Sequence, residues 1–185
     1  IVHADVMDGV YVPNITFGMP MIKAFRQNST LPIDAHLMIT KPEKYVGKFC
    51  DAGADIVTFH PDASDDVQGA LDIIKSKGKK CGLVVNADVD FDVVKPYLGQ
   101  IDMLVIMTVQ AGFGGQSFMP LCLAKAKLCA TEREKHGYKY LIEVDGGVSE
   151  KNIALLKEAG VDIAVAGSSV FKSDNPQKTI ESLHI

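Results

Sequence analysis

The sequence predicts an α/β protein in which parallel strands alternate with helices, and specifically a (β/α)8 TIM barrel. Seven short, apolar and β-branched runs are each followed by helical periodicity or by a turn leading to it, at residues 1–6, 33–38, 56–60, 80–85, 103–109, 140–144 and 163–166. Polar residues also recur at the carboxyl ends of several runs. An open sheet concentrates its ligands at one switch point, whereas a barrel draws its site from all its βα loops, so this pattern favours the barrel.

The segments between the strands carry their own helix signals. Pro42 stands where a helix would begin, before apolar residues spaced as on one helix face. Ser149 is predicted to cap the helix that follows it. Residues 51–55 (DAGAD) and 158–162 (EAGVD) nearly match, and each closes a helix with Gly and opens the next strand. This echo indicates one repeated βα unit.

The chain of 185 residues, 47% hydrophobic, is predicted to form a single TIM-barrel domain over residues 1–185, with seven βα units visible. A full barrel has eight units. Because the sequence starts inside a strand and without Met, we expect the first βα unit, of roughly 30 residues, to be missing from this chain.

Composition excludes several classes of function. A net charge of −4 without a basic block argues against a nucleic-acid partner. The sequence has no run of about 18 apolar residues and no charged-then-apolar amino terminus, so neither a membrane span nor a secretory signal is expected, and we predict a cytoplasmic protein. The cysteines lack C-x-x-C spacing and are predicted to be reduced, buried thiols: Cys50, Cys81, Cys122 and Cys129.

Three of the predicted strands bring imidazoles or carboxylates to their carboxyl ends. His3 and Asp5 lie two positions apart and therefore share one face of a strand. His36 lies near the end of the second run, and Asp145 directly follows the sixth. Each is weak evidence alone, since a single His there is more often a hydrogen-bonded rim residue and a single Asp a turn residue or cap. Together they predict a site for Zn²⁺, Mn²⁺, Fe²⁺ or Co²⁺ with open positions, the alternative being four unrelated rim residues.

Glycine-rich turns at other strand ends predict a phosphate site. They are Gly112-Phe113-Gly114-Gly115-Gln116, Asp145-Gly146-Gly147 and Ala166-Gly167-Ser168-Ser169. Backbone N–H groups in such turns and at helix starts bind phosphate oxygens, and the last loops of a barrel are where these sites recur. Three methionines near strand ends, Met7, Met38 and Met107, fit either core filling or a water-excluding cap over a charged intermediate.

Over essentially its whole length the chain resembles the ribulose-phosphate 3-epimerase family. The motifs that carry the resemblance are specific in combination: HADVMDGVYVPNITFG at 3–18, DAHLM at 34–38, VIMTV at 105–109, GFGGQ at 112–116, VDGG at 144–147 and AGS at 166–168. The resemblance implies a (β/α)8 barrel that interconverts D-ribulose 5-phosphate and D-xylulose 5-phosphate through an enediolate, an isomerase reaction of the pentose phosphate pathway.

The resemblance also implies roles for individual residues. His3, Asp5, His36 and Asp145 would bind one divalent metal ion per subunit (Zn, Fe, Mn or Co), with Asp5 as proton acceptor and Asp145 as proton donor. The phosphorylated ketose would be held by His36, Gly112, Phe113, Gly114, Gly115, Gly146, Gly147, Gly167 and Ser168, while Met7, Met38 and Met107 would cap the intermediate. A homo-oligomer is expected.

Some loops at the predicted barrel opening depart from the family pattern and leave the identity of the substrate open. Gln110-Ala111 replaces the usual Glu-Pro, residues 86–90 replace an Asn-Pro-x-Thr-Pro run, and Asp62 stands where Glu is usual. These changes allow a hexulose phosphate substrate such as allulose 6-phosphate, or another ketose phosphate, with the same mechanism. A non-catalytic phosphate-binding barrel is a third hypothesis, against which the complete set of four candidate ligands argues.

Overall fold

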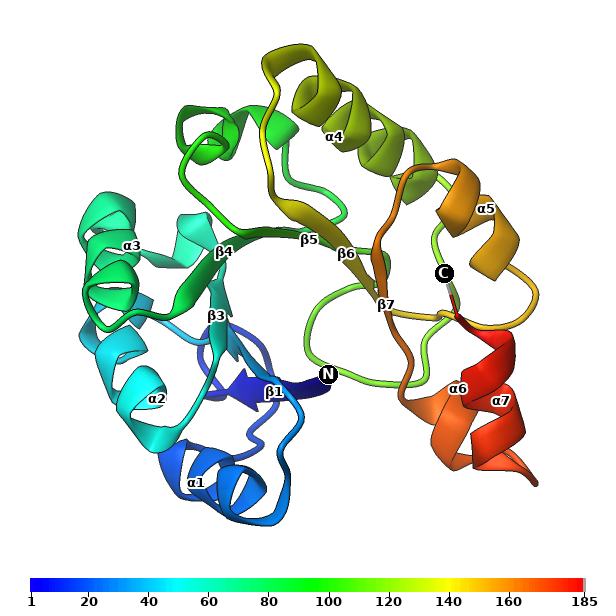
Figure 1. Cartoon of the computed structure of the whole chain (residues 1–185), viewed down its shortest axis with the longest axis horizontal. Helices are drawn as coiled ribbons and strands as arrows, with labels where there is room; N and C mark the ends of the chain where they lie inside the picture. The colour runs from blue at the N-terminus through cyan, green and yellow to red at the C-terminus, as the bar shows by residue number, and fades with distance from the viewer. Residues whose placement is uncertain (185) are drawn as a thin grey trace. The chain divides into compact units, whose positions relative to one another are not determined.

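Strands and helices alternate along the chain, as the sequence predicts (Figure 1). The structure, a computed structural model, describes residues 1–184. These residues group into two compact units, which are described separately. The first unit holds Ile1–Val84 with Ile101–Met103, and the second holds Val85–Gln100 with the residues from Leu104 onward.

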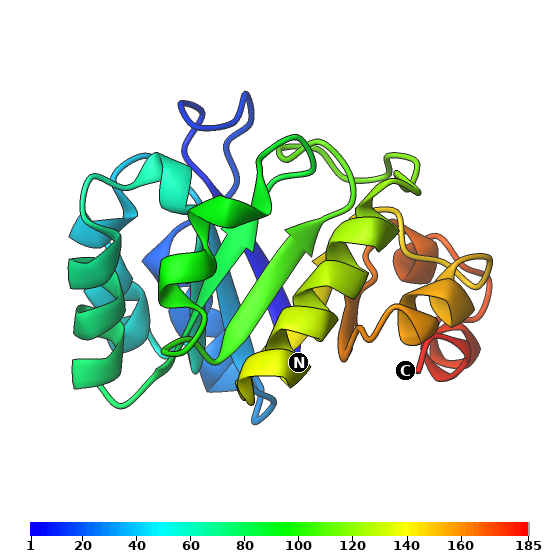
Figure 2. The same ribbon diagram turned by 90° about the horizontal axis from the view of Figure 1, so that it is seen from above.

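The first unit is a four-stranded parallel sheet with helices packed on one face. Its strands follow one another in chain order: β1 (Val2–Met7), β2 (Ile33–Met38), β3 (Ile56–Phe59) and β4 (Lys80–Val85). The helices between them are α1 (Met19–Asn28), α2 (Val46–Ala52) and α3 (Val67–Ser76), with short 3-10 turns at Pro42–Lys44 and Pro61–Ala63. Figures 1 and 2 show these helices side by side, and α2 contacts both α1 and α3.

The core of this unit lies between the sheet and the helices. Alternate residues of β2, namely Ile33, Ala35 and Leu37, are fully buried, as are Leu71 and Ile74 of α3. This alternation leaves the other residues of the strand on the opposite face. Because β2 is buried on both faces, polar residues on that second face must find partners inside the protein.

Two strands of this unit, β2 and β4, are each tied near their start to an aspartate that stands just before the next strand. Asp55 donates its backbone N–H to the Ile33 carbonyl at 2.9 Å, and its carboxylate accepts the Ile33 N–H at 3.1 Å. Asp102 makes the same reciprocal pair with Cys81, at 2.8 and 2.9 Å. Each carboxylate thus satisfies a backbone donor near the start of the preceding strand.

The aspartates that end the two repeated pentapeptides, Asp55 and Asp162, both make this reciprocal pair of hydrogen bonds. In the second unit Asp162, which ends the second pentapeptide, makes two hydrogen bonds of 2.8 Å with Ile142. Its carboxylate also forms an ion pair with Arg133. In the first unit the Asp55 carboxylate forms an ion pair with Arg26 at 2.8 Å. The glycines of both pentapeptides, Gly53 and Gly160, have positive φ angles and follow helices. The echo in the sequence is therefore a repeated structural unit.

Asp55→Asn is expected to lower the free energy of unfolding by about 1 kcal/mol at pH 7, since a half-exposed ionic hydrogen bond is partly screened by solvent. Burial raises the pKa of Asp55, but the Ile33 N–H, Lys79 and Arg26 lower it more, so the net shift is downward. The carboxylate therefore stabilises the fold above its unfolded pKa, near 3.9, and this contribution is lost as the pH falls through the lower folded pKa.

Urea unfolding of wild type and Asp55→Asn at pH 7 and pH 3 measures this effect. The difference between them should shrink at pH 3. Asp51→Asn is the matched control, because Asp51 pairs with Lys77 at an exposed site and should change stability by no more than about 0.5 kcal/mol. A loss at Asp55 that persists unchanged at pH 3 would contradict the electrostatic explanation.

The second unit continues the same alternation. Its elements are 3-10 turns at Phe91–Val93 and Lys95–Tyr97, β5 (Met103–Met107), α4 (Cys122–His136), β6 (Leu141–Asp145), α5 (Ile153–Glu158), β7 (Ile163–Val165), α6 (Ser168–Phe171) and α7 (Pro176–Ser182). β5 neighbours β6, which pairs parallel with β7. Helix α4 buries Cys122, Ala126 and Cys129 along one face and ends at His136, before Gly137, whose φ is 67°.

One predicted cap is wrong. The helix after β6 begins at Ile153, and Ser149 makes no side-chain cap. Instead Asn152 accepts the Ser149 N–H at 2.9 Å and donates to the Gly147 carbonyl at 2.9 Å. An amide both donates and accepts, so it can hold the turn on two sides, which a serine hydroxyl at 149 does not do here.

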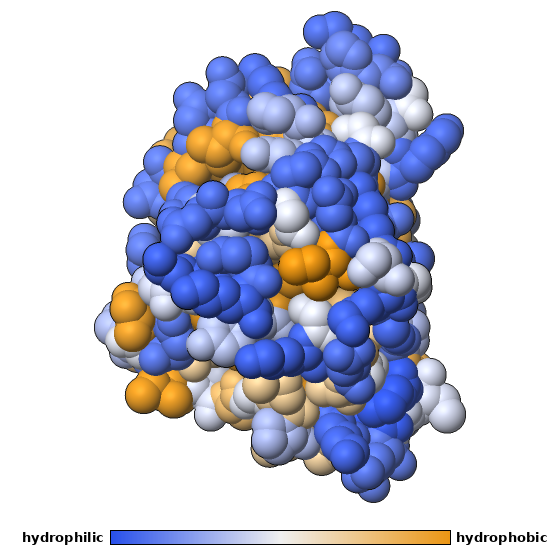
Figure 3. Space-filling model, turned by 90° about the vertical axis from the view of Figure 1, so that its left-hand side faces the viewer, coloured by the Kyte–Doolittle hydropathy of each residue, from blue (hydrophilic) through white to orange (hydrophobic). Residues whose placement is uncertain are grey.

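Other features of the described residues agree with the sequence or add to it. All four cysteines are free and buried, as predicted. The face over the helices of the first unit is mostly hydrophilic, with small, separate apolar patches (Figure 3), as expected for amphipathic helices that cover a sheet. Among residues 1–184, no helix has the length and apolar character needed to cross a membrane.

Candidate metal and phosphate-sugar site

The register of β1 on β2 places four polar residues next to one another. In this parallel pair His3 lies opposite Asp34, and Asp5 lies opposite His36. Since residues two apart share a strand face, all four lie on the same face of the first unit. Ala4, between His3 and Asp5, is buried and belongs to the opposite face.

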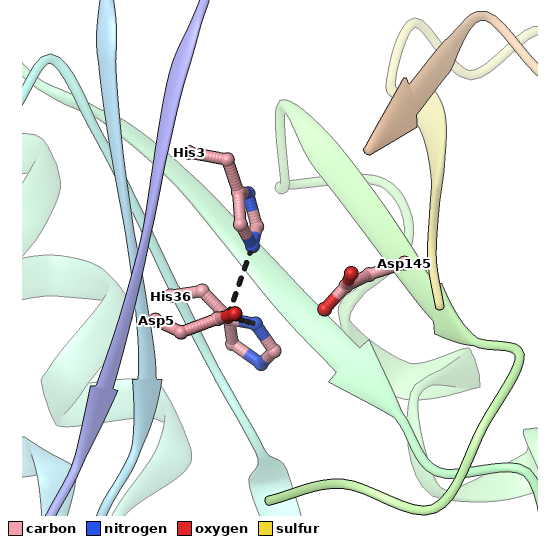
Figure 4. Close-up of side chains that lie close together, drawn as sticks. All are labelled: His3, Asp5, His36 and Asp145. Carbon is pink, nitrogen blue, oxygen red and sulfur yellow. Dashed lines mark hydrogen bonds and ion pairs between the residues drawn. The ribbon is translucent and has the colours of Figure 1, made fainter. Parts of the chain in front are cut away.

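Asp5 is the centre of this group. Its Oδ1 lies 3.2 Å from His3 Nε2 and 3.1 Å from His36 Nδ1 (Figure 4). His36 is completely buried, whereas the Asp5 side chain keeps 39% of its surface exposed. Two imidazoles therefore hold a carboxylate that a small molecule can still reach.

The two histidines keep Asp5 ionised. Burial raises the pKa of Asp5, but its hydrogen bonds to His3 and His36, with the charges of both rings, lower the pKa far below the ordinary range. The result is an anionic oxygen flanked by two ring nitrogens, whose atoms lie within 4.8 Å of one another. This donor set fits a divalent cation of the Zn²⁺, Mn²⁺, Fe²⁺ or Co²⁺ type.

His3 has a buried carboxylate behind it. Its Nδ1 lies 2.9 Å from Asp34 Oδ2, and Asp34 is fully buried. Thr58 on β3 donates its hydroxyl to the other oxygen of Asp34 at 3.3 Å. The arrangement directs the opposite nitrogen of His3, Nε2, toward Asp5.

His60 is a neighbour that sequence reasoning did not select. It follows β3 in an extended conformation and is fully buried, with its Nε2 3.0 Å from His36 Nε2. Burial, together with the adjacent His36, holds the pKa of His60 well below its usual value, so the ring is neutral. The available signal was a third His at the carboxyl end of a predicted strand, as with His36.

Asp145 ends β6 in the second unit. Its carbonyl accepts the Thr108 N–H at 2.8 Å and the Thr108 hydroxyl at 3.0 Å, so the end of β6 is anchored to the residue after β5. Figure 4 draws Asp145 with the three residues of the first unit. The contacts described above thus unite His3, Asp5 and His36, while Asp145 is placed at a strand end on the other unit.

The turn after Asp145 needs both of its glycines. Gly146 and Gly147 have φ angles of 122° and 66°, a backbone region that residues other than glycine rarely adopt. A Cβ on Gly147 would lie 2.5 Å from the backbone nitrogen of Phe118. Close approach of two backbone segments therefore requires Gly at position 147.

Gly147→Ala is expected to lower the free energy of unfolding by about 1–3 kcal/mol more than Gly78→Ala. Both glycines have a φ of 66°, so each alanine must adopt a left-handed backbone conformation, which costs about 1–2 kcal/mol. Only Gly147 adds a clash, because a Cβ at Gly78 meets nothing within 4 Å. Chemical denaturation of both variants measures the two free energies of unfolding. Equal decreases would mean that the contact with the Phe118 backbone does not contribute.

The glycine loop after β5 is closed by one side chain. The Gln116 amide donates to the carbonyls of Gln110 at 2.6 Å and Phe113 at 2.8 Å. Gly112 and Gly115 have φ angles of 117° and 75°. The loop is thus preshaped, with its glycines free of side chains that would shield the backbone.

The remaining predicted residues lie at strand ends. Gly167 precedes α6, and its carbonyl accepts the Val170 and Phe171 N–H groups. Met7 and Met38 are register partners at the ends of β1 and β2, and Met107 ends β5. All three methionines are buried, which is compatible with either packing or capping.

Comparison with known proteins identifies close relatives. Residues 1–171 match the model of the "Ribulose-phosphate 3 epimerase family". The ribulose-phosphate 3-epimerase of Escherichia coli strain K12 is 41% identical over 184 residues, covering 99% of this chain and 82% of that protein. The Bacillus subtilis strain 168 enzyme of the same name is 40% identical, covering 98% of this chain and 84% of that protein.

Solved structures match in fold. A 3-hexulose-6-phosphate synthase superposes with a TM-score of 0.69 at 19% identity, covering 99% of this chain and 98% of that one. KGPDC from Streptococcus mutans gives a TM-score of 0.72 at 16% identity, covering 98% of this chain and 94% of that one. At these identities the likeness concerns the fold alone. It confirms the predicted class, a parallel α/β fold of the TIM-barrel type with seven strands among residues 1–184.

Proposed function

Because the chain belongs to the ribulose-phosphate 3-epimerase family, we propose that it interconverts D-ribulose 5-phosphate and D-xylulose 5-phosphate by inverting carbon 3. The chain is an epimerase of carbohydrate metabolism. The observation that carries the proposed mechanism is the Asp5 carboxylate, partly exposed and held between two imidazoles. Such a group can take a proton from a bound sugar.

The reaction explains why two carboxylates are needed. Carbon 3 lies next to the carbonyl of carbon 2, so its hydrogen is weakly acidic. Inversion removes that hydrogen from one face and returns a proton to the other, through an enediolate. Asp5 would accept the first proton and Asp145 would donate the second, each within hydrogen-bond reach of carbon 3. With the substrate epimers exchanged, the two residues exchange roles.

His3 Nε2, Asp5, His36 Nδ1 and Asp145 would hold one divalent ion per subunit, and Zn²⁺, Fe²⁺, Mn²⁺ and Co²⁺ all suit this set. When bound, the ion would supply Lewis-acid stabilisation of the negative charge that develops on the substrate oxygens. Support comes from the contacts of the first three residues and from the family resemblance, which assigns Asp145 as the fourth.

The substrate phosphate would bind backbone N–H groups of the glycine turns at Gly112 to Gly115, Gly146, Gly147, Gly167 and Ser168. Positive φ angles and open space at Gly115 support this, because unshielded N–H groups can converge on an anion. Met7, Met38 and Met107 would exclude water from the reacting carbon. We also propose that the protein is cytoplasmic and that it is, as the resemblance implies, a homo-oligomer.

The purified protein, incubated with D-ribulose 5-phosphate in D2O, tests the function. The expected product is D-xylulose 5-phosphate carrying deuterium at carbon 3, seen by NMR. Chelation should stop the reaction, and added Co²⁺ or Zn²⁺ should restore it. Faster conversion of a hexulose 6-phosphate would mean that the hexulose phosphate, not the pentulose phosphate, is the substrate. The absence of deuterium exchange at carbon 3 with every ketose phosphate tested would support a non-catalytic phosphate-binding barrel.

A further inference from the structure

His36 uses both of its ring nitrogens, and each contact has a different partner. Nδ1 lies 3.1 Å from Asp5 Oδ1, while Nε2 lies 3.0 Å from His60 Nε2. The His36 and His60 rings stack with their centroids 5.1 Å apart and their planes at 25°. Both side chains are fully buried. His60 takes no part in the proton transfers proposed above.

The distance between the two Nε2 atoms requires one proton between them. A neutral imidazole carries a proton on one nitrogen and a lone pair on the other. If His60 donates, His36 must carry its own proton on Nδ1, which then points at Asp5. If His36 donates, its Nδ1 presents a lone pair beside the Asp5 oxygen. Only the second arrangement allows His36 Nδ1 to bind a cation.

We propose that His60 is a positioning residue that accepts the His36 Nε2 proton and thereby holds the His36 Nδ1 lone pair toward the bound divalent ion. The inference rests on the metal site of the proposed function and adds a residue behind one of its ligands. Outer partners of this kind set the tautomer and orientation of ligating histidines.

The surroundings of His60 hold its ring in place for this role. The Tyr11 ring lies 4.9 Å from it by centroids. The Tyr11 hydroxyl in turn donates to the Asp62 carboxylate at 3.2 Å, and Asp62 lies two residues after His60. The His60 ring therefore contacts an aromatic neighbour besides His36, and that neighbour is anchored to the same loop.

Packing alone does not account for a histidine here. Among the described residues, His60 Nδ1 is buried without a hydrogen-bond partner. An unsatisfied buried polar atom is destabilising, and an apolar ring of similar size would avoid that cost. A histidine that serves only to fill space would thus be a poor choice, whereas an acceptor aimed at a metal ligand explains it.

The experiment measures Zn²⁺ affinity of the metal-free full chain by competition with a chelator. His60→Phe keeps a ring beside Tyr11 but removes the acceptor, and should weaken binding about 10–100-fold. His60→Gln offers a carbonyl acceptor and should recover most of the affinity. His136→Phe is the matched control, since His136 is exposed at the end of α4 and pairs with Glu132. The melting temperature of each metal-free variant separates a change of fold from a change of binding.

A second measurement needs no variant. Long-range ¹H–¹⁵N spectra of the Zn²⁺-loaded wild type should show His36 protonated at Nε2 and His60 at Nδ1, and the reverse tautomers would overturn the inference. Equal Zn²⁺ affinity of wild type and His60→Phe would overturn it as well while leaving the metal site intact. Wild-type protein that binds no divalent ion would overturn the metal site itself.

Discussion

Asp5→Asn is expected to abolish epimerisation while the protein stays folded. The amide is similar in size and can still accept a hydrogen bond from His3 or His36, so the packing of β1 on β2 is kept. It cannot take up a proton from carbon 3, a loss worth about 10²–10⁴-fold in rate for a general base. It is also a weaker metal ligand than a carboxylate, so we expect kcat to fall by at least this factor.

Three measurements make the Asp5 result interpretable: kcat, metal content and melting temperature. Asp65→Asn is the control, because Asp65 is an exposed aspartate of the same unit that pairs with Lys41. It should leave all three unchanged. An Asp5→Asn enzyme that turns over at more than about a tenth of the wild-type rate would refute the assignment of Asp5 as proton acceptor.

Asp145→Asn is expected to stop epimerisation and yet leave one half of the reaction. With Asp5 intact, the hydrogen at carbon 3 of D-ribulose 5-phosphate can still be removed, so deuterium from D2O should enter the recovered substrate. D-xylulose 5-phosphate, which would lose its proton to Asp145, should show no exchange. This asymmetry follows from two bases on opposite faces.

NMR of each recovered epimer after incubation in D2O measures the asymmetry. Asp174→Asn, an exposed aspartate of the second unit, serves as the control and should epimerise normally. If Asp145→Asn exchanges both epimers equally, one base serves both faces and the role given to Asp145 is wrong. If it retains its metal but exchanges neither epimer, Asp145 is needed for more than the second proton transfer.

Much of the fold could be predicted from periodicity. The strands at 33–38 and 80–85 have the predicted bounds, and the others differ by one or two residues at one or both ends. Buried parallel strands read as continuous apolar runs, which makes them easy to find. The predicted cap at Ser149 is wrong because capping depends on which side chain reaches a free N–H group: the Asn152 side chain bonds the turn before the helix, and α5 begins without a side-chain cap.

The candidate site was predictable to the extent that its residues share a strand face or end a strand. His3 and Asp5 could be selected because residues two apart share a strand face, and Asp145 because it ends β6. Asp34 and His60 were not selected, although His60 ends a predicted run, because each acts through a histidine on the neighbouring strand. Their partners depend on register, which a local pattern does not encode.

The sequence by itself determined the α/β class, the family and the residue types that could bind a cation, because strand periodicity and the order of motifs are properties of the chain. Only the tertiary structure decided which nitrogen of each histidine faces Asp5. That choice follows from the parallel register of β1 on β2 and from what lies behind each ring, a carboxylate for His3 and a second imidazole for His36. Ring orientation is a matter of long-range packing, and it determines which lone pairs a metal ion can use.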